Sequence, residues 1–317
     1  MQNLLTVIVI GLNEAAGLAA ALNAVFRHCP EGWEMEVIYV DSGSRDQSVA
    51  IASSIDGVRV LHLDDEKPSA AKARNVGLRI ARGRYIQLLD GDSVVEPGWM
   101  EKGITYLDAH ADVSCVFGHC LEMHPEQSIY MRVCGYDWHV PPGEYRLCGG
   151  NAMWRKTAFD RVGLFDAEFR LGEEPDLCYR VRQAGGHIVC IDVPMVQHDL
   201  GMLTFAAYWK RAENSGRAYT RVALRYWRNK EKLWLYETLR NFVEPSIWLG
   251  LWLFGGLLAG FGVGVGLVTV WWLMRALNTA RKNRHRTHGL QDALLYGLHT
   301  QFVRLPIVVG QLKALFG

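Results

Sequence analysis

The 317-residue sequence contains no internal repeat, no low-complexity tract and no Cys-x-x-Cys pair. Its seven cysteines are odd in number, so the spacing argues against a disulfide framework and against a zinc ribbon. The residues MQNLLTVIVIG carry no basic leader and only a short apolar run, so we expect a first β-strand there rather than a signal peptide. These absences favour reduced thiols in a cytoplasmic domain.

Charge is also scarce, at 21% of residues against 50% hydrophobic residues, and the mean hydropathy is +0.01. These values exclude a disordered chain and a polytopic membrane protein. The net charge of +1 conceals an asymmetry, because residues 1–200 carry 18 basic and 28 acidic side chains, whereas residues 201–317 carry 16 and 5. A basic, apolar second part indicates a membrane surface as partner and no nucleic acid.

The first 95 residues alternate between β-rich apolar runs and Ala- or Leu-rich segments. We predict strands at 4–10, 36–40, 58–63 and 84–89, separated by helices at about 15–28, 44–55 and 68–82. This order is typical of an α/β, Rossmann-like fold, in which a mostly parallel sheet has helices on both faces. Beyond residue 95 we expect helices at 97–110 and 173–184, strands at 113–122, 147–154 and 187–193, and a loop-rich insert at 124–146.

Polar residues follow three of the predicted strands, at Asn13-Glu14, Asp41-Ser42 and Asp90-Gly91-Asp92. Ligands of parallel sheets bind beyond the carboxyl ends of the strands, so we expect a site at this edge. Two carboxylates one residue apart can hold a divalent cation, and their oxygen atoms suit Mg²⁺ or Mn²⁺. Such an ion neutralises charge on a leaving diphosphate. His198, which ends the last predicted strand of this region, is either a further metal ligand or a structural histidine.

Two residues near this edge leave alternatives open. Asp41 either accepts hydrogen bonds from a base or ribose, or forms an Asx turn or a helix cap with Ser44. Arg74, in the helix before the fourth strand, either pairs with a phosphate or stacks on a base, or lies on a solvated helix face.

A further acidic cluster opens the helix at 173–184. Glu173, Glu174 and Asp176 place three carboxylates in four positions, which exceeds what helix capping requires. Because neighbouring like charges raise the pKa of one member, this cluster is suited to a general base.

The last third of the chain has membrane-like composition. Residues 202–244 interleave aromatic side chains with nine Lys or Arg, which favours interfacial amphipathic helices. Residues 245–274 then form a run of 30 without one charge, longer than the ~20 needed to span a bilayer. Seven glycines interrupt this run and both of its flanks are basic. The segment is therefore either a single membrane span, which we favour, or a re-entrant hairpin. We expect the apolar tail beyond it to lie in or on the bilayer.

In their order and spacing, six motifs within residues 4–200 resemble those of family 2 glycosyltransferases, the inverting nucleotide-sugar enzymes of GT-A fold. The motifs are Ile10-Gly11-Leu12-Asn13-Glu14, Val40-Asp41-Ser42-Gly43-Ser44, Ala73-Arg74-Asn75-Val76-Gly77-Leu78, Leu89-Asp90-Gly91-Asp92, Cys148-Gly149-Gly150-Asn151 and Glu173-Glu174-Pro175-Asp176-Leu177-Cys178-Tyr179-Arg180. The first motif lacks the family's common Pro. Where processive members have a QxxRW signature, this chain has Tyr208-Trp209-Lys210-Arg211, so it resembles a single-addition enzyme.

The resemblance implies a role for each matching position. The nucleotide-sugar site would comprise Asn13, Glu14, Asp41, Ser42, Arg74, Asp90 and Gly91. Asp92 and Asp90, with His198 as a candidate, would ligate Mg²⁺ or Mn²⁺. Glu174 would be the catalytic base, with Glu173 and Asp176 as alternates. The acceptor pocket would be lined by Gly149, Gly150, Asn151, Trp209 and Arg211.

We therefore predict metal-dependent, inverting hexosyl transfer from a nucleotide-sugar, with a UDP-sugar favoured, to a hydroxyl of a lipid-linked or membrane-proximal acceptor. The alternatives are a polyprenyl-phosphate glycosyltransferase, whose acceptor needs no base, and a non-catalytic scaffold of a polysaccharide export system. We expect a GT-A domain at 1–200 on the cytoplasmic side of the inner membrane. It is followed by interfacial helices at 201–244, the transmembrane or re-entrant segment at 245–275 and a basic linker and tail at 276–317.

Overall fold

The computed structural model describes residues 3–138 and 140–316. The chain divides into two compact units, and each is described by itself. The first unit comprises Met1–Met123 and Trp138–Leu200, and the second comprises His124–Asp137 and Gly201–Gly317. The segment 124–137, expected within the first domain, therefore belongs to the second unit.

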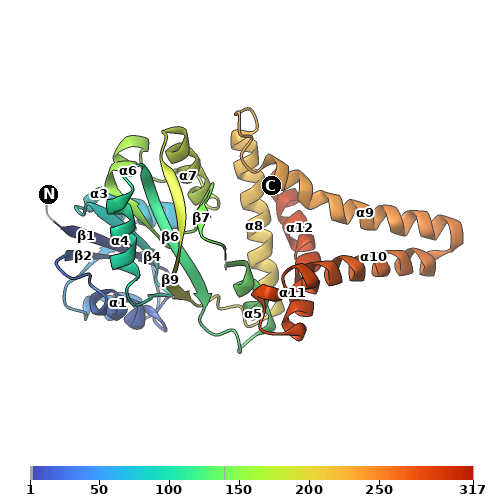
Figure 1. Ribbon diagram of the computed structural model, residues 1–317, viewed down its shortest axis with the longest axis horizontal. Coiled ribbons are helices and arrows are strands. Elements are labelled where there is room, and N and C mark those ends of the chain that lie inside the picture. Colours follow the sequence, from blue (N-terminus) through green and yellow to red (C-terminus); the bar gives the residue numbers. More distant parts are fainter. Residues whose placement is uncertain (1–2, 139, 317) are drawn as a thin grey trace. The chain divides into compact units, whose positions relative to one another are not determined.

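The first unit contains a mixed nine-stranded sheet of order β3-β2-β1-β4-β8-β6-β9-β5, with β7 beside β9 (Figure 1). The strands are β1 Leu4–Gly11, β2 Glu34–Asp41, β3 Val58–His62, β4 Tyr85–Asp90, β5 Ser93–Val95, β6 Val113–Glu122, β7 Gly143–Glu144, β8 Ala152–Arg155 and β9 His187–His198. The parallel arrangement is confirmed for β1 to β4 and for β6 with β9, whereas β5, β7 and β8 pair antiparallel.

Apolar residues on both faces explain why the central strands form. Positions 5–10 of β1 are all buried, and five of the six are apolar, as expected of a parallel strand covered on both faces. The chain runs from β1 to β2 and β3 and then returns to β4 on the opposite side of β1. Right-handed crossovers therefore place α1 (Leu18–Arg27) and α2 (Ser48–Ser53) on one face and α3 (Ala70–Ile80) on the other.

This reversal of strand order creates a topological switch point between β1 and β4, where ligands of α/β sheets bind. The register levels the strand ends at this point, because Ile10 lies opposite Asp90 and Gly11 lies opposite Asp41. The three polar motifs predicted at strand ends are thereby brought to one edge of the sheet.

Several boundaries differ from those predicted. Helix α3 begins at Ala70, because the Ser69 side chain caps it by accepting from the Lys72 amide at 3.3 Å, so Pro68 precedes the helix. The insert at 124–146 is more regular than expected and contains α5 (Ile129–Gly135) and a 3-10 turn. The remaining helices of the first unit are α4 Trp99–Ala109, α6 Lys156–Val162 and α7 Glu173–Gln183.

The second unit is helical, with α8 Phe205–Tyr226, α9 Leu235–Ala259, α10 Phe261–Lys282, α11 Leu290–Phe302 and α12 Arg304–Phe316. Two glycines allow α8 and α12 to pack backbone to backbone. A Cβ on Gly216 would meet the Ile307 carbonyl oxygen, and one on Gly310 would meet the Glu213 carbonyl oxygen. Segment 124–137 is bound to α11, because Tyr136 donates to Asp292 at 2.7 Å.

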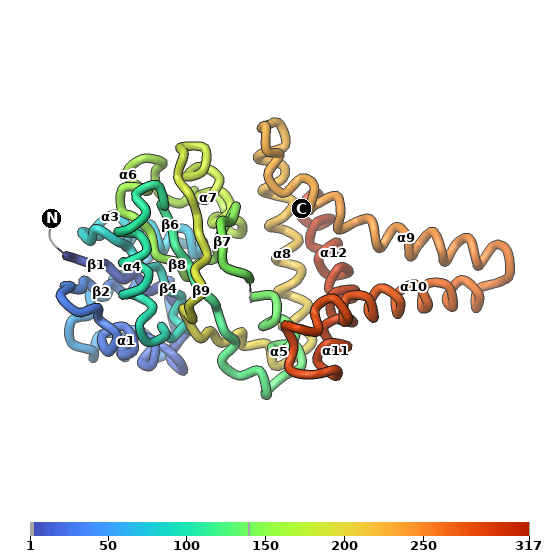
Figure 2. Tube along the Cα trace, viewed as in Figure 1, coloured from blue at the N-terminus to red at the C-terminus, as the bar shows by residue number. Residues whose placement is uncertain are grey.

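The expectation of a single membrane-spanning helix is wrong. The chain reverses at Gly260 (φ 92°), and α9 and α10 lie side by side as an antiparallel hairpin (Figure 2). Both helices are long and apolar enough to cross a bilayer. The close approach depends on small residues, since a Cβ on Gly255 would lie 2.8 Å from the Gly264 Cα. Whether this hairpin spans or re-enters a bilayer stays a prediction.

Candidate active site

The loops after β1 and β2 are joined by side-chain hydrogen bonds. Asn13, in the left-handed region at φ 60°, accepts from the Arg45 amide at 2.8 Å, and its own amide donates to the Ser44 hydroxyl at 2.8 Å. Asp41 accepts from the amides of Gly43 and Ser44, both at 2.9 Å. Asp41 therefore forms the predicted Asx turn, Ser44 does not cap α2, and a contact of Asp41 with a base or ribose stays a prediction. Ser42 donates its amide to the Gly11 carbonyl at 2.9 Å and lies on the same edge.

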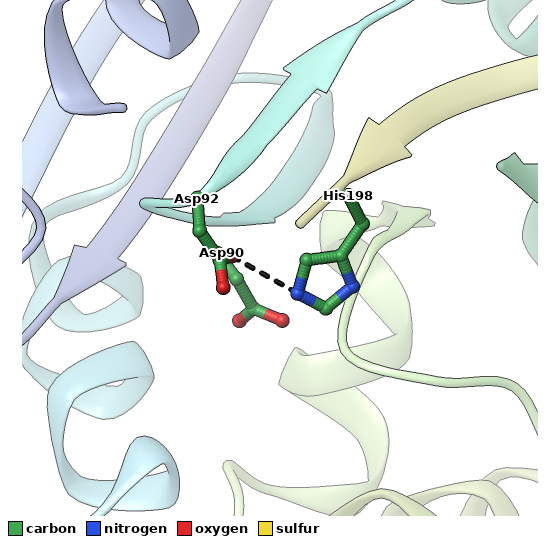
Figure 3. A group of neighbouring side chains, drawn as sticks. All are labelled: Asp90, Asp92 and His198. Atoms are coloured by element: carbon green, nitrogen blue, oxygen red, sulfur yellow. Dashed lines mark ion pairs between the residues drawn. The ribbon is translucent and has the colours of Figure 1, made fainter. Parts of the chain in front are cut away.

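The candidate metal ligands come together (Figure 3). Asp90, Asp92 and His198 each offer a ligand atom within 4.8 Å of the others. The short strand β5 causes this, because it directly follows Asp92 and pairs Ser93 with His198 of β9. The His198 Nε2 lies 3.0 Å from Asp92 Oδ1. Trp138 stacks on the imidazole with ring centroids 5.0 Å apart and planes at 6°.

The donor set of two carboxylates and one imidazole fits a divalent cation such as Mn²⁺, and its oxygen atoms also suit Mg²⁺. Burial lowers the pKa of His198, but its hydrogen bonds with Asp92 and Cys120 and the charges of both aspartates raise it to about 10. Without a bound cation, the His198 imidazolium partly balances the negative charge of Asp90 and Asp92.

Neighbouring residues shape the loop that carries Asp90. The Asp90 backbone amide donates to Asn151 Oδ1 at 2.9 Å. The Asn151 side-chain Nδ2 in turn donates to the Ser93 hydroxyl at 3.1 Å. Asn151, which was expected to line an acceptor pocket, is buried and holds this loop in place. Gly91 permits a close approach, since its Cβ would lie 3.0 Å from Glu14 Cγ. Burial and the charges of Asp92 and Asp90 raise the pKa of Glu14 to about 7.

Arg74 connects the candidate metal ligands to the acidic N-terminus of α7. Its Nη2 lies 3.0 Å from Asp90, and its Nη1 lies 3.1 Å from Glu174 and 3.2 Å from Glu173. The residue is only 2% exposed, so the solvated-face alternative is wrong. Burial alone would lower the pKa of the Arg74 guanidinium. The charges of Asp90, Glu174 and Glu173 outweigh burial, so the pKa lies above its ordinary value. Arg74 therefore positions three carboxylates, and its contact with a donor stays a prediction.

The three carboxylates of α7 have different environments. Asp176 is buried and pairs with Arg180 at 2.7 Å, which directs it away from the cluster. Burial and the charge of Glu174 raise the pKa of Glu173 to about 7, although Arg74 opposes the shift. The Glu174 side chain is 22% exposed against 7% for Glu173, so Glu174 is the more accessible of the two, and its role as a base stays a prediction.

Substitution at Gly150 tests the position of Arg74. A Cβ there would clash with Arg74 Nη2 and lie 3.3 Å from Asp90 Oδ2, whereas a Cβ on Gly149 would have no atom of the described residues within 4 Å. We expect Gly150→Ala to destabilise the fold by about 1–3 kcal/mol through overpacking. The matched control Gly149→Ala should change stability by less than about 0.5 kcal/mol. Thermal unfolding of both variants measures the difference, and equal destabilisation would show that the guanidinium does not occupy this position.

The raised pKa of Glu173 predicts a pH-dependent effect on stability. Because the folded protein holds this proton more tightly than the unfolded chain, Glu173 ionisation costs stability as pH rises from about 4.5 to about 7. Glu173→Gln removes the titration and keeps an oxygen acceptor for Arg74. We expect the melting temperature of the variant minus that of wild type to increase as the pH rises from 5 to 8. Differential scanning fluorimetry measures this difference. An unchanged difference across this range would contradict the assignment.

Two predicted acceptor-pocket residues lie in the other unit, and one contact of the site was not predicted. Trp209 and Arg211 belong to α8 of the second unit, so their role in an acceptor pocket stays a prediction. Trp138, which orients His198, was missed, because no local pattern in the 124–146 insert links it to the end of β9.

The first unit matches a known protein family. The model of glycosyl transferase family 2 matches residues 6–163. Glycosyltransferase AglE of Haloferax volcanii is 33% identical over 104 residues, which cover 32% of this chain and 34% of AglE. Glycosyltransferase GlyG of Streptococcus pneumoniae is 29% identical over 145 residues, covering 44% of this chain and 47% of GlyG. The chain thus aligns with less than half of either relative.

Longer matches extend into the second unit. The glucosyl-dolichyl phosphate glucuronosyltransferase of Haloferax volcanii is 23% identical over 283 residues, covering 74% of this chain and 87% of that protein. Mannosyltransferase PcManGT from Pyrobaculum calidifontis, solved with GDP-Man and Mn²⁺, superposes with a TM-score of 0.64 at 14% identity, covering 98% of this chain and 87% of that one. S. aureus TarS 1–349, solved with UDP-GlcNAc, superposes with a TM-score of 0.56 at 16% identity. The match covers 95% of this chain and 92% of that one.

The first unit has the GT-A fold of nucleotide-sugar glycosyltransferases. The chain belongs to glycosyltransferase family 2, as the six sequence motifs predicted.

Proposed function

We propose that the chain catalyses metal-dependent, inverting transfer of a hexosyl group from a nucleotide-sugar, with a UDP-sugar favoured, to a hydroxyl of a lipid-linked or membrane-proximal acceptor. The observation that carries the proposal is the continuous cluster in which Arg74 connects Asp90 to Glu173 and Glu174. A diphosphate site and a candidate base are thereby held together at the switch point of the sheet.

Each side chain has a distinct task in this proposal. Asp90, Asp92 and His198 would hold Mg²⁺ or Mn²⁺, which when bound neutralises charge on the leaving nucleoside diphosphate. Glu174 accepts the proton of the acceptor hydroxyl, whose oxygen then attacks the anomeric carbon from the face opposite the diphosphate. Arg74 keeps Glu174 oriented, because its guanidinium holds the Glu174 carboxylate at 3.1 Å.

The relatives support the donor and acceptor classes without identifying either. One structural neighbour was solved with GDP-Man and Mn²⁺ and another with UDP-GlcNAc. The relative that spans most of this chain is named for a dolichyl phosphate-linked substrate, which favours a lipid-linked acceptor here.

The hairpin supports attachment to the membrane. Its exposed apolar side chains near the turn include Phe254, Leu257, Leu258 and Phe261. Both ends of the hairpin carry basic residues, so an even number of crossings or a re-entrant insertion keeps them on the cytoplasmic side with the nucleotide-sugar pool. We propose that the chain is bound to the cytoplasmic face of the inner membrane.

The stereochemical outcome and the acceptor test this function together. The full chain in detergent would receive an α-linked UDP-sugar with either a lipid-linked saccharide or bare polyprenyl phosphate, and NMR would report the anomeric configuration of the product. We expect a β-linked sugar on a saccharide hydroxyl. Retained configuration would contradict inversion, and transfer only to bare polyprenyl phosphate would assign the chain to the alternative that needs no base.

A further inference from the structure

Three arginines of the second unit lie near the base of the hairpin, and we call them the arginine cluster: Arg240 on α9, Arg275 on α10 and Arg304 at the start of α12. Glu244, one helical turn beyond Arg240, is buried among these helices. It accepts from Arg275 Nη2 at 2.7 Å and from Trp271 Nε1 at 3.0 Å. Helix α9 packs on both α10 and α12, which brings the three elements together.

Positive charge exceeds negative charge in this cluster. Glu244 is the carboxylate that acts on Arg304, whereas Arg275 and Arg240 repel it. Burial and these two neighbouring cations lower the pKa of the Arg304 guanidinium despite Glu244. With Glu237, one turn before Arg240 on α9, three guanidinium groups stand against two carboxylates, which leaves an excess of positive charge that a bound anion would neutralise.

Hydrogen-bond donors are also in excess at the same place. Asn241 Nδ2, Trp248 Nε1 and Arg275 Nε are buried and have no acceptor among the described residues. Asn241, Glu244 and Trp248 are spaced three and four residues apart on α9, so they lie on one face of the helix. Buried donors without acceptors are costly, so this face is suited to a group that offers acceptors and no donors.

The cluster lies where the hairpin changes from charged to apolar. Glu244 is the last charged residue before the uncharged run, and Arg275 is the first charged residue after it. Beyond them, Leu249, Leu253 and Leu257 on α9 are 56%, 47% and 86% exposed. If the apolar part of the hairpin enters a bilayer, as proposed above, this boundary lies at the depth of the headgroups.

We propose that the arginine cluster binds the phosphodiester group of an anionic phospholipid. A phosphodiester supplies negative charge and acceptor oxygens but no donors, and guanidinium groups bind it with two parallel hydrogen bonds. The phospholipid would fix the depth of the hairpin and hold the bases of α9, α10 and α12 together. This proposal depends on the membrane placement in the proposed function but not on the sugar-transfer reaction.

A lipid titration tests the site. Phosphatidylglycerol or phosphatidylcholine would be titrated into the full chain in neutral detergent, and tryptophan fluorescence and native mass spectrometry would report binding. We expect saturable binding of phosphatidylglycerol alone, with the dissociation constant raised at least about tenfold by Arg240→Gln/Arg304→Gln. The matched control Arg281→Gln/Lys282→Gln removes the same charge from the last turn of α10 and should change it less than about twofold.

The remaining outcomes overturn the proposal. Equal weakening in both double variants would show diffuse charge attraction, and absence of saturable binding would show that no site exists. Tighter binding of polyprenyl phosphate than of phosphatidylglycerol would make this an acceptor site instead. Arg240→Gln alone, at an exposed position, gives a variant with an intact core if the double variant fails to fold. Binding is measured without donor or acceptor, so an inactive transferase that binds phosphatidylglycerol separates the two hypotheses.

Discussion

Asp92→Asn is expected to lower kcat/KM for sugar transfer by at least about 10²-fold while leaving the fold intact. Asp92 lies 3.0 Å from His198. Of the two candidate carboxylate ligands, Asp90 pairs with Arg74 and Asp92 does not. The amide keeps the shape of the side chain but removes the charge that attracts a divalent cation. Most of the loss should therefore appear as weaker activation by Mn²⁺, measured by titrating the metal at a saturating donor concentration.

A surface aspartate provides the control for this substitution. The Asp160 side chain is 57% exposed and pairs with Lys156 at 2.8 Å, so Asp160→Asn removes one carboxylate far from the candidate metal ligands in sequence and in exposure. We expect its metal activation curve to match that of wild type. Asp92→Asn activity that saturates at the wild-type Mn²⁺ concentration would show that Asp92 is not a ligand.

Glu174→Gln is expected to lower kcat by about 10²–10⁴-fold, the usual contribution of a general base. The Gln side chain still accepts a hydrogen bond from Arg74, which lies 3.1 Å from Glu174 in the wild type, so binding of the nucleoside diphosphate should change little. The measurement is the rate of transfer at saturating donor and acceptor, with UDP affinity measured separately by calorimetry.

Glu173→Gln is the matched comparison for the base. Glu173 has a pKa of about 7 and is only 7% exposed on its side chain, so it is partly protonated at neutral pH and poorly accessible. We expect this variant to retain far more activity than Glu174→Gln, mainly at the acidic end of the pH profile. The reverse ranking would identify Glu173 as the base.

The strand-end motifs were predictable because their signals are local. A β-rich apolar run followed by Asp90-Gly91-Asp92 defines a buried parallel strand and its polar end within a few residues. The register that levels β1, β2 and β4 follows from the same alternation of strands and helices. The Asp90 and Asp92 pair was therefore accessible from local sequence and the GT-A fold from the six motifs, whereas the role of His198 was left open because its place depends on the pairing of β5 with β9.

Long-range partners were not accessible in this way. Arg74 resembled a solvated helix residue, and only folding shows that its guanidinium lies against α7, far along the chain. Likewise, Asn151 was predicted from its motif to line a pocket, but the packing of β8 beside β4 turns its amide toward Asp90. Such pairings depend on antiparallel strands β5 and β8, which the alternation pattern did not predict.

The hairpin was misjudged because only uncharged residues were counted. A run of 30 residues is too short for two spans, but α9 and α10 have 25 and 22 residues because each extends into its charged flank. Glu244 and Arg275, which border the uncharged run, pair with each other across the two helices at 2.7 Å. Partner charges of this kind are visible only after the helices are paired.

Metal-dependent turnover of a nucleotide-sugar tests the central claim most directly. The full chain in detergent would be offered UDP-, GDP- and dTDP-sugars with Mn²⁺ or Mg²⁺, and release of the nucleoside diphosphate would be measured beside Asp92→Asn. We predict release from one donor class, with UDP-sugars favoured, that requires the metal and is lost in the variant. No turnover or binding of any donor by the folded protein would contradict the account and favour a non-catalytic scaffold.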